Sequence, residues 1–400
     1  CYICGQYSLA YGLDQTFAIA TGTSPATPAP AAPIVRDYTA LTGATGGSGW
    51  NGQDGTSAGS PVIVTYSFET SAYSYLGFEG YSTNYINSFR PLNLTEKANA
   101  VEALGLWDRA SGISFLEVPA GLGDIRFGVY NFDYDPLYPW AAGYANYPGR
   151  TYEAGSSTYS YENEQGGDVF LNSSEAYSLG QVHLYTHELG HALGFKHPFD
   201  DTPTLASDLD NITQTVMSYT GSWGTTLGPL DINAARYRYG TADHTNTSSW
   251  AWNAASLLLT QTGTAAANRI MGVSVRDLLS GGEGNDTLAG FGGNDTINGD
   301  GGLDVLFGGT GNDSINGGAG NDTVTGDDGN DTISGGTGDD YLLGDIGDDI
   351  FFTDAGADSV YGDSGFDSLS YANATIAVIF DGSFQTNNAG SVLVANTTAT

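Results

Sequence analysis

Cysteine is almost absent from this 400-residue chain, because its two cysteines, Cys1 and Cys4, both lie at the N-terminus. A fold held together by disulfides is therefore excluded. Basic residues are also scarce, with 11 Lys and Arg against 45 Asp and Glu and a net charge of −34. This balance excludes nucleic acid and anionic lipid as natural partners and favours cations. No apolar run reaches the roughly 18 residues of a membrane span.

The basic residues that do occur end at Arg276, so the charge divides the chain into two parts. A Pro-rich run, TSPATPAPAAP, separates the first residues from the rest and is typical of a linker. Such shifts in composition predict domain boundaries. The predicted division is an N-terminal tail or prosegment with its linker (1–36), a catalytic domain (37–245), a connection with a degenerate first repeat (246–280), a repeat domain (281–370) and a C-terminal strand module (371–400).

The first large domain has mixed α and β patterning. Apolar residues recur at helical spacing over 94–107, with Thr95 expected as the N-cap, and over 181–193, where Gly194 is expected to end the helix. Another short helix is expected over 231–239. Alternating or short apolar runs predict strands. These expected strands lie at 62–68, 113–118, 124–130 and 168–172.

The second domain repeats every nine residues, ten times without slippage, from Gly281 to Ser370. The fourth position is always Gly, the sixth always Asp and the eighth always Leu, Ile, Val or Phe. A flexible linker would not place an apolar residue at every ninth position. The pattern predicts a coil in which six residues turn, three form a strand, and the eighth position stacks into a thin apolar column.

Cations are needed to fold this coil, because residues 281–370 hold acidic side chains and no basic ones. Carboxylates and turn carbonyls at regular spacing suit several Ca²⁺ ions better than Zn²⁺ or Cu²⁺. The pattern is similar to the RTX calcium-binding repeat, which implies a parallel β-roll. We expect the roll to be unfolded at sub-micromolar Ca²⁺ and folded at millimolar Ca²⁺. The expected ligands are Asp286, Asp295, Asp304, Asp313, Asp322, Asp331, Asp340, Asp349, Asp358 and Asp367.

A metal-binding motif lies in the first domain, where residues 187–197 spell H-E-x-x-H-x-x-G-x-x-H. His187 and His191 are four residues apart, so a helix places both imidazoles on one face. Gly194 lets the chain turn, so that His197 can supply a third nitrogen. Three histidines leave one coordination position open for water, which is the catalytic arrangement for one Zn²⁺. Glu188 can reach that water without being a ligand.

Met217 follows the motif by twenty residues, in Val-Met-Ser-Tyr, and is expected to form an apolar floor under the metal. The long histidine motif followed by such a Met-turn resembles the metzincin signature. With the repeats downstream, the chain resembles the serralysins, which are secreted bacterial zinc endopeptidases. The resemblance implies an α+β metzincin catalytic domain, with a twisted mainly parallel sheet and an active-site helix, followed by an all-β parallel β-roll.

The same resemblance implies the roles of individual residues. Glu188 is the implied general base, and Tyr219 is a further zinc ligand that swings away to stabilise the transition state. Residues 140–145 resemble the edge strand that lines the cleft, to which an extended substrate can add as an antiparallel strand. The implied substrate-binding residues are Trp140, Ala141, Ala142, Gly143 and Tyr144.

The implied protein is a monomer, secreted to the extracellular space by leaderless export, that hydrolyses proteins or peptides and is a target for proteinaceous inhibitors. Two further hypotheses remain open. The chain is alternatively a calcium-dependent surface or adhesion protein with an inactive metzincin domain. The N-terminal tail is alternatively an inhibitory prosegment, with Cys4 as a thiolate that blocks the zinc.

Overall fold

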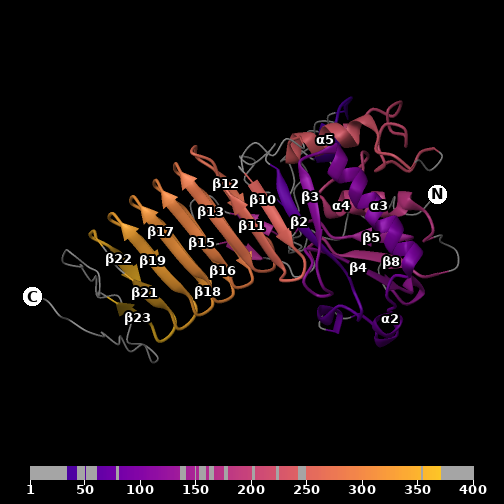
Figure 1. Cartoon of the computed structure of the whole chain (residues 1–400). Coiled ribbons are helices and arrows are strands. Elements are labelled where there is room, and N and C mark those ends of the chain that lie inside the picture. The colour runs from indigo at the N-terminus through magenta and orange to yellow at the C-terminus, as the bar shows by residue number, and fades with distance from the viewer. Residues whose placement is uncertain are drawn as a thin grey trace, which may run out of the picture.

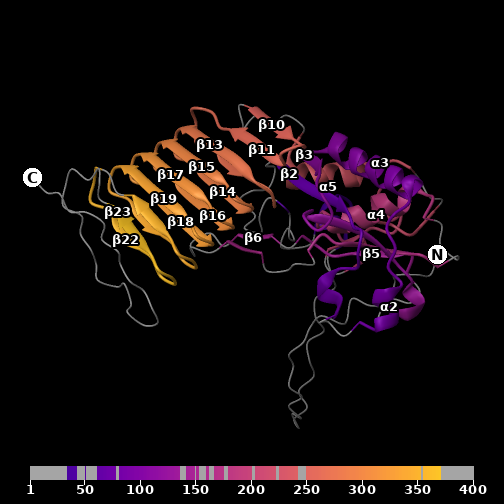
Figure 2. The same ribbon diagram turned by 60° about the horizontal axis from the view of Figure 1, so that its bottom comes forward.

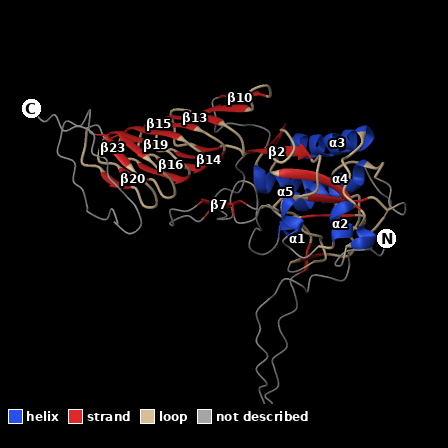
Figure 3. Cartoon of the chain, turned by 90° about the horizontal axis from the view of Figure 1, so that it is seen from below, coloured by secondary structure: helices blue, strands red, loops and turns tan. Residues whose placement is uncertain are grey.

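The structure is a computed structural model in which an α+β unit is followed by a β-roll (Figure 1). It describes residues 34–42, 50, 61–77, 81–135, 141–148, 150–152, 159–161, 166–174, 179–200, 203–221, 225–241, 249–352 and 355–370. Residues 1–33 of the predicted tail, with Cys1 and Cys4, and the predicted C-terminal strand module lie outside these residues. The end of the predicted tail is described and belongs to the N-terminal unit, because Ile34–Val35 forms a strand that pairs within it. Among the described segments, all helices belong to the N-terminal unit, and the roll holds only strands and loops (Figure 3).

A five-stranded sheet organises the N-terminal unit, in the order β3-β2-β4-β8-β5. Its strands are β2 (Val62–Phe68), β3 (Ile113–Glu117), β4 (Ile125–Tyr130), β5 (Gly143–Ala145) and β8 (Val169–Asn172). All pairs are parallel except β5 with β8, which is antiparallel. The strands expected at 62–68, 113–118, 124–130 and 168–172 are therefore confirmed to within a residue or two at their ends.

Three long helices complete the unit: α3 (Leu94–Ala110), α4 (Val182–Ala192) and α5 (Pro229–Tyr239). The shorter elements are α1 (Thr39–Thr42), α2 (Thr83–Asn87) and the 3-10 turns η1 (Ser74–Gly77) and η2 (Phe132–Tyr134). Strand β1 (Ile34–Val35) pairs in parallel with β9 (Thr204–Leu205), and β6 (Arg150–Tyr152) pairs with β7 (Tyr159–Tyr161) as a hairpin.

The N-cap of α3 differs from the prediction. The helix begins at Leu94, so Thr95 lies inside the first turn and Asn93 is the cap. Asn93 Oδ1 accepts hydrogen bonds from the backbone N–H groups of Thr95 and Glu96, at 2.9 and 3.0 Å. Glu96 returns a bond by accepting from Asn93 N–H at 2.8 Å. Asn93 wins because it completes a capping box with Glu96, which Thr95 cannot.

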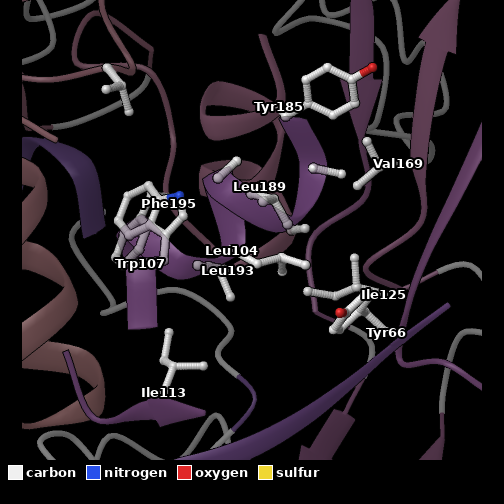
Figure 4. Close-up of a cluster of buried hydrophobic side chains, with 14 of the residues drawn as sticks. Tyr66, Leu104, Trp107, Ile113, Ile125, Val169, Tyr185, Leu189, Leu193 and Phe195 are labelled. Carbon is white, nitrogen blue, oxygen red and sulfur yellow. The ribbon is translucent and has the colours of Figure 1, made fainter. Parts of the chain in front are cut away.

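The core of the unit lies where α3 and α4 pack on the sheet (Figure 4). Leu104 and Trp107 of α3 meet Leu189 of α4 and the strand residues Ile125 and Val169, and all of them are buried. The Trp107 indole also donates a hydrogen bond to the Thr186 carbonyl at 3.1 Å. This packing fixes α4, the helix that carries the histidine motif.

The roll consists of two sheets of parallel strands that alternate along the chain. One sheet runs β11-β13-β15-β17-β19-β21-β23 and the other β12-β14-β16-β18-β20-β22, with every strand paired to the one 18 residues later. The strands are β11 (Leu258–Thr262), β12 (Arg269–Met271), β13 (Asp277–Glu283), β14 (Thr287–Gly292), β15 (Thr296–Gly301), β16 (Val305–Thr310), β17 (Ser314–Ala319), β18 (Thr323–Asp328), β19 (Thr332–Thr337), β20 (Tyr341–Leu343), β21 (Ile350–Phe352), β22 (Ser359–Tyr361) and β23 (Ser368–Ser370).

An apolar column runs through the roll and consists of the eighth residue of each repeat, with a smaller buried cluster of Met271, Ala289, Phe291 and Phe307 near its start. The column includes Leu288, Leu306, Val324 and Leu342 on one side, each paired with the next across the sheet. The coil and the apolar column expected from the nine-residue period are therefore confirmed. Strands β13 to β19 are six or seven residues long, and not the three expected, because each continues into the first residues of the next repeat. The stacking starts before Gly281, because Ile270 and Leu279 already belong to the column. The earlier turns keep the strand residue but have other residues where Gly was required.

The first strands of the roll lie beside β2 and β3 of the N-terminal unit (Figures 1 and 2). Strand β10 (Ser249–Asn253) pairs antiparallel with β11 at this end. A small buried cluster joins the two units: Ile63, Leu116 and Val118 from the N-terminal unit with Leu259, Val273 and Val275 from the roll. The Ser274 hydroxyl adds a hydrogen bond to the Leu122 carbonyl at 2.5 Å. The roll is therefore packed onto the unit that carries the histidines.

Candidate metal centre and cleft

Three histidines meet at the end of α4. His187 and His191 lie one turn apart on the helix, as their spacing predicted, and His197 returns after Gly194, whose φ is +87°. The Nε2 atom of His197 lies 3.0 Å from that of His191 and 3.3 Å from that of His187. Two nitrogens at about 2.0–2.1 Å from one tetrahedral ion are roughly 3.3 Å apart. The three side chains therefore fit one Zn²⁺.

Each ring has its second nitrogen occupied. His187 Nδ1 donates to the Val216 carbonyl and His191 Nδ1 to the Phe195 carbonyl, both at 2.7 Å. His197 Nδ1 lies 2.5 Å from Asp200 Oδ2. Since carbonyls and carboxylates accept only, each Nδ1 carries a proton and donates it outward, which leaves the three Nε2 atoms as the nitrogens that face one another. Rings oriented in this way by outer acceptors are the arrangement that a metal site uses.

Burial keeps two of these rings neutral. It lowers the pKa of His187 to about 3, with the His197 ring adding to the effect. Burial also lowers the pKa of His191 well below its ordinary value. Neutral imidazole is the form that binds metals, so the site is ready for a cation at neutral pH.

Tyr219 and Met217 lie where the sequence placed them relative to the histidines. The Tyr219 hydroxyl is 3.5 Å from His187 Nε2 and makes a shorter hydrogen bond with His197 Nε2. Met217 is fully buried beneath α4 at Gly190. A Cβ on Gly190 would lie 2.3 Å from Met217 Sδ, so only glycine lets the helix approach this sulfur.

Two carboxylates that support the centre were not predicted. Asp200 holds His197, and Asp231 of α5 accepts from Thr215 Oγ1 at 2.5 Å and from Val216 N–H at 2.8 Å. Asp231 thereby fixes the backbone of Val216, the residue whose carbonyl holds His187. Burial raises the pKa of Asp231 to about 7. The sequence could have indicated Asp200, because it is a carboxylate three residues after the ligand His197. No local sequence feature predicts the role of Asp231.

Glu188 lies beside the cleft strand. Its carboxyl is buried, which raises its pKa to about 8. A Cβ built on Gly143 of β5 would lie 3.0 Å from Glu188 Oε1 and 3.1 Å from the Phe170 carbonyl oxygen. The missing side chain of Gly143 therefore leaves the space that Glu188 occupies.

The predicted cleft strand is an edge strand. Strand β5 ends the order of the five-stranded sheet, so among the described strands it has β8 as its only neighbour. The carbonyls of Ala141 and Ala142 form hydrogen bonds with the neighbouring strand at Asn172. Ala141 accepts from Asn172 Nδ2 at 2.8 Å, and Ala142 accepts from Asn172 N–H at 2.9 Å. Tyr144 stacks on Phe170 with ring centroids 4.5 Å apart. Trp140 lies outside the described residues.

A methyl group at Gly143 is expected to disturb Glu188 alone. In Gly143→Ala the Phe170 backbone cannot retreat, so the Glu188 carboxyl must move. We expect a loss of about tenfold in kcat/KM on a protein substrate, because small misplacements of a reacting group are costly. The prediction is checked by measuring the hydrolysis rate and, in parallel, the zinc content of each protein. Gly77→Ala, where a Cβ meets nothing within 4 Å, is the matched control. Unchanged rates in Gly143→Ala would contradict the contact.

The sixth-position aspartates form a buried ladder through the roll. One oxygen of each accepts the backbone N–H of the residue 18 positions earlier, which is Asn268 for Asp286 and an aspartate for the others, as Asp304 accepts from Asp286 at 2.8 Å. The other oxygen is buried and has no hydrogen-bond partner among the described residues. This holds for Asp286, Asp295, Asp304, Asp313, Asp322, Asp331, Asp340 and Asp349.

These second oxygens face backbone carbonyls. A Cβ on Gly281 would lie 2.4 Å from Asp286 Oδ2 and 2.8 Å from the Gly299 carbonyl oxygen. Such a cradle of oxygens without donors fits Ca²⁺, which takes carboxylate and carbonyl ligands. The last two aspartates of the prediction, Asp358 and Asp367, accept from Asp340 and Asp349 in the same way. All ten predicted ligands are therefore placed in one repeating geometry.

Residues 271–306, 299–333 and 334–369 match the family model described as the RTX calcium-binding nonapeptide repeat. The chain is also 30% identical to a serralysin of Proteus mirabilis over 227 residues, which are 47% of this chain and 42% of that protein. It is 32% identical to the metallopeptidase AprA of Pseudomonas marginalis over 140 residues, 34% and 27% of the two chains. A matrilysin of Felis catus is 28% identical over 147 residues, 35% and 49% of the two chains. The chain thus spans less than half the length of these relatives.

The described residues thus form an α+β unit with three converging histidines, joined to a β-roll whose repeats match the calcium-binding model. In its repeats and in its relatives the chain is similar to serralysin-type metalloproteases. In the part of the chain that the structure describes, no helix is both long and apolar enough to span a membrane.

Proposed function

We propose that the chain is a secreted zinc-dependent endopeptidase that hydrolyses proteins and is stabilised by calcium bound to its roll. The observation that carries the proposal is the convergence of three histidine Nε2 atoms at the helix whose Glu188 carboxyl lies against the edge strand β5. The serralysins and the AprA metallopeptidase among its relatives support the same reaction class. RTX repeats with such relatives also support an extracellular, bacterial setting.

A zinc ion held by His187, His191 and His197 would supply a water of lowered pKa and polarise the scissile carbonyl. The chain's own groups would do the rest. Glu188 takes the proton from the attacking water and passes it to the leaving nitrogen. The Tyr219 hydroxyl, which already reaches the histidine nitrogens, donates a hydrogen bond to the carbonyl oxygen as negative charge grows.

Strand β5 would position the substrate. An extended peptide that adds to this edge as an antiparallel strand is held by main-chain hydrogen bonds, whatever its side chains are. Because Glu188 lies against Gly143 in the same strand, the bound peptide passes next to the proposed base. This arrangement fits a protease that acts on unfolded or flexible segments.

The competing function is a calcium-dependent surface or adhesion protein whose metalloprotease domain is inactive. The roll alone would serve both functions. The Glu188 carboxyl favours the enzyme, because it is buried and burial raises its pKa to about 8. An ionisable group held in such a place is costly for the folded protein, and a proposed role as general base accounts for it.

Hydrolysis of casein by the purified protein tests the proposal. In millimolar Ca²⁺ we expect hydrolysis that a zinc-selective chelator abolishes and added Zn²⁺ restores. Far-UV circular dichroism should show a folded roll throughout, so that loss of activity is assigned to zinc. A folded protein that binds one zinc per chain but cleaves nothing would favour the adhesion function.

A further inference from the structure

Lys196 is a buried cation next to the third histidine. The chain has only two lysines, Lys97 and Lys196. Lys196 is 8% exposed, and its ammonium donates to the carbonyls of His197, Asp200 and Pro203. The distances to the His197 and Pro203 oxygens are 3.4 and 3.1 Å. One side chain thereby gathers three carbonyls that follow the histidine motif.

The match between donors and acceptors explains how this charge is tolerated. An ammonium has three donors and no acceptor, and three carbonyls supply an oxygen for each. A buried charge without such partners would be strongly unfavourable. Without the ammonium, the carbonyls of Asp200 and Pro203 would lose the donor that it supplies, and the His197 carbonyl would keep, among the described residues, only the Asp200 N–H at 3.2 Å. This loss would favour an opened loop that exposes the carbonyls to water.

The gathered segment carries the support of His197. Asp200 contributes its carbonyl to Lys196 and its carboxylate to His197 Nδ1. The backbone of Lys196 is itself fixed, because its N–H donates to the Leu41 carbonyl of α1 at 2.9 Å. Lys196 therefore connects α1, through its backbone, to Asp200, the residue that orients His197.

The other two ligands do not depend on this segment. His187 and His191 are held by the carbonyls of Val216 and Phe195, outside the segment that Lys196 gathers. His197 alone is oriented by a side chain on a loop. A substitution at Lys196 should therefore disturb the orientation of His197 and leave His187 and His191 in place.

We propose that Lys196 is a positioning residue: an internal cation that holds the carbonyls of His197, Asp200 and Pro203 so that Asp200 keeps His197 in its metal-binding orientation. This proposal rests on the proposed zinc site. It adds to that site a determinant of metal retention that touches neither metal nor substrate.

Two measurements on Lys196→Met test the proposal, with Lys97→Met as the control on the other lysine. In the zinc-free protein, we expect backbone amides of 197–205 to exchange hydrogen faster, and those of α4 before Ala192 to be unchanged. In the zinc-loaded protein, we expect zinc affinity to fall about 10–100-fold, the usual effect of losing an outer-shell contact, and zinc transfer to a chelator to be faster. The cobalt-substituted protein should show an altered visible spectrum, which a merely less stable protein would not.

Chemical rescue provides a second variant if Lys196→Met does not fold. Lys196→Ala leaves the space of the missing propylammonium group, so propylammonium chloride should slow both exchange and zinc transfer. Sodium chloride at the same ionic strength should not. Unchanged amide exchange and zinc transfer in Lys196→Met, or equal effects of the two salts on Lys196→Ala, would overturn the proposal. Failure of the wild-type protein to bind zinc would instead refute the proposed function. The exchange data on the zinc-free protein would still test whether the hydrogen bonds of Lys196 hold the residues after His197 in place.

Discussion

Glu188→Gln is expected to abolish protein hydrolysis while zinc stays bound. The three converging nitrogens belong to His187, His191 and His197, so the substitution leaves the ligand set intact. It removes the group that takes up and returns the proton, and general acid–base catalysis contributes roughly 10²–10⁴-fold to such reactions. Casein hydrolysis should therefore fall by at least about 100-fold.

The stability of the zinc-free variant toward unfolding distinguishes a loss of catalysis from misfolding. Burial raises the pKa of Glu188 to about 8, so the folded zinc-free protein holds this carboxyl protonated at neutral pH. A carboxyl whose folded pKa is raised loses stabilising effect as pH rises from its ordinary pKa toward 8. Glutamine cannot ionise, so the zinc-free variant should be no less stable than wild type, and more stable at pH 8.

Glu102→Gln, an exposed change on α3, is the matched control and should retain full activity. Zinc content, thermal unfolding and hydrolysis would be measured on all three proteins. If Glu188→Gln kept more than about a tenth of wild-type activity, the loss would be far below that of a general base. Glu188 would then have no catalytic role of this kind.

The parts that sequence predicted well are those whose signal is local and periodic. The four-residue spacing of His187 and His191 needs only a helix, and the nine-residue repeat needs only a coil that stacks on itself. Both appear in the structure with the expected geometry. The one difference at the start of α3 is also local, because Asn93 and not its neighbour Thr95 is the N-cap.

The parts that sequence missed are contacts between distant segments. Asp231 supports His187 through the Val216 backbone, 15 residues away in sequence. Gly143 makes room for Glu188 across 45 positions, and no pattern in either segment predicts the other. Lys196 seemed an ordinary residue within the motif, because its burial depends on carbonyls that follow the third histidine. Such contacts are fixed by tertiary packing, which a single sequence does not reveal.

Removal of calcium is expected to unfold the roll. Its apolar column is one residue wide per strand, and eight buried carboxylate oxygens beside it lack a hydrogen-bond partner among the described residues. Burial, the main cause, raises the pKa of Asp295 and Asp331 to about 8, and that of Asp304, Asp313, Asp340 and Asp349 to about 6. Ionised without a cation, these groups oppose the folded state.

The pH dependence should change sign with calcium. Without calcium, raised pKa values mean that the folded roll binds more protons than the unfolded chain, so its stability falls as pH rises from about 4 to 8. With calcium, protons compete with the ion for the same oxygens, so the calcium needed for folding increases as pH falls. Acid should therefore partly replace calcium in its absence and weaken calcium binding in its presence.

Far-UV circular dichroism during calcium titrations at pH 7.5 and 5.5 measures both effects. We expect the β signal of the roll to appear between micromolar and millimolar Ca²⁺ at pH 7.5 and to need more Ca²⁺ at pH 5.5. Asp331→Asn should raise the calcium midpoint, because it weakens one oxygen of the ladder. Asp328→Asn removes an equal charge from an exposed position three residues earlier and should not. A roll that keeps its β signal in excess chelator would show that the ladder is stable without cations. Equal shifts in the two variants would mean that calcium acts through net charge and not through the buried oxygens.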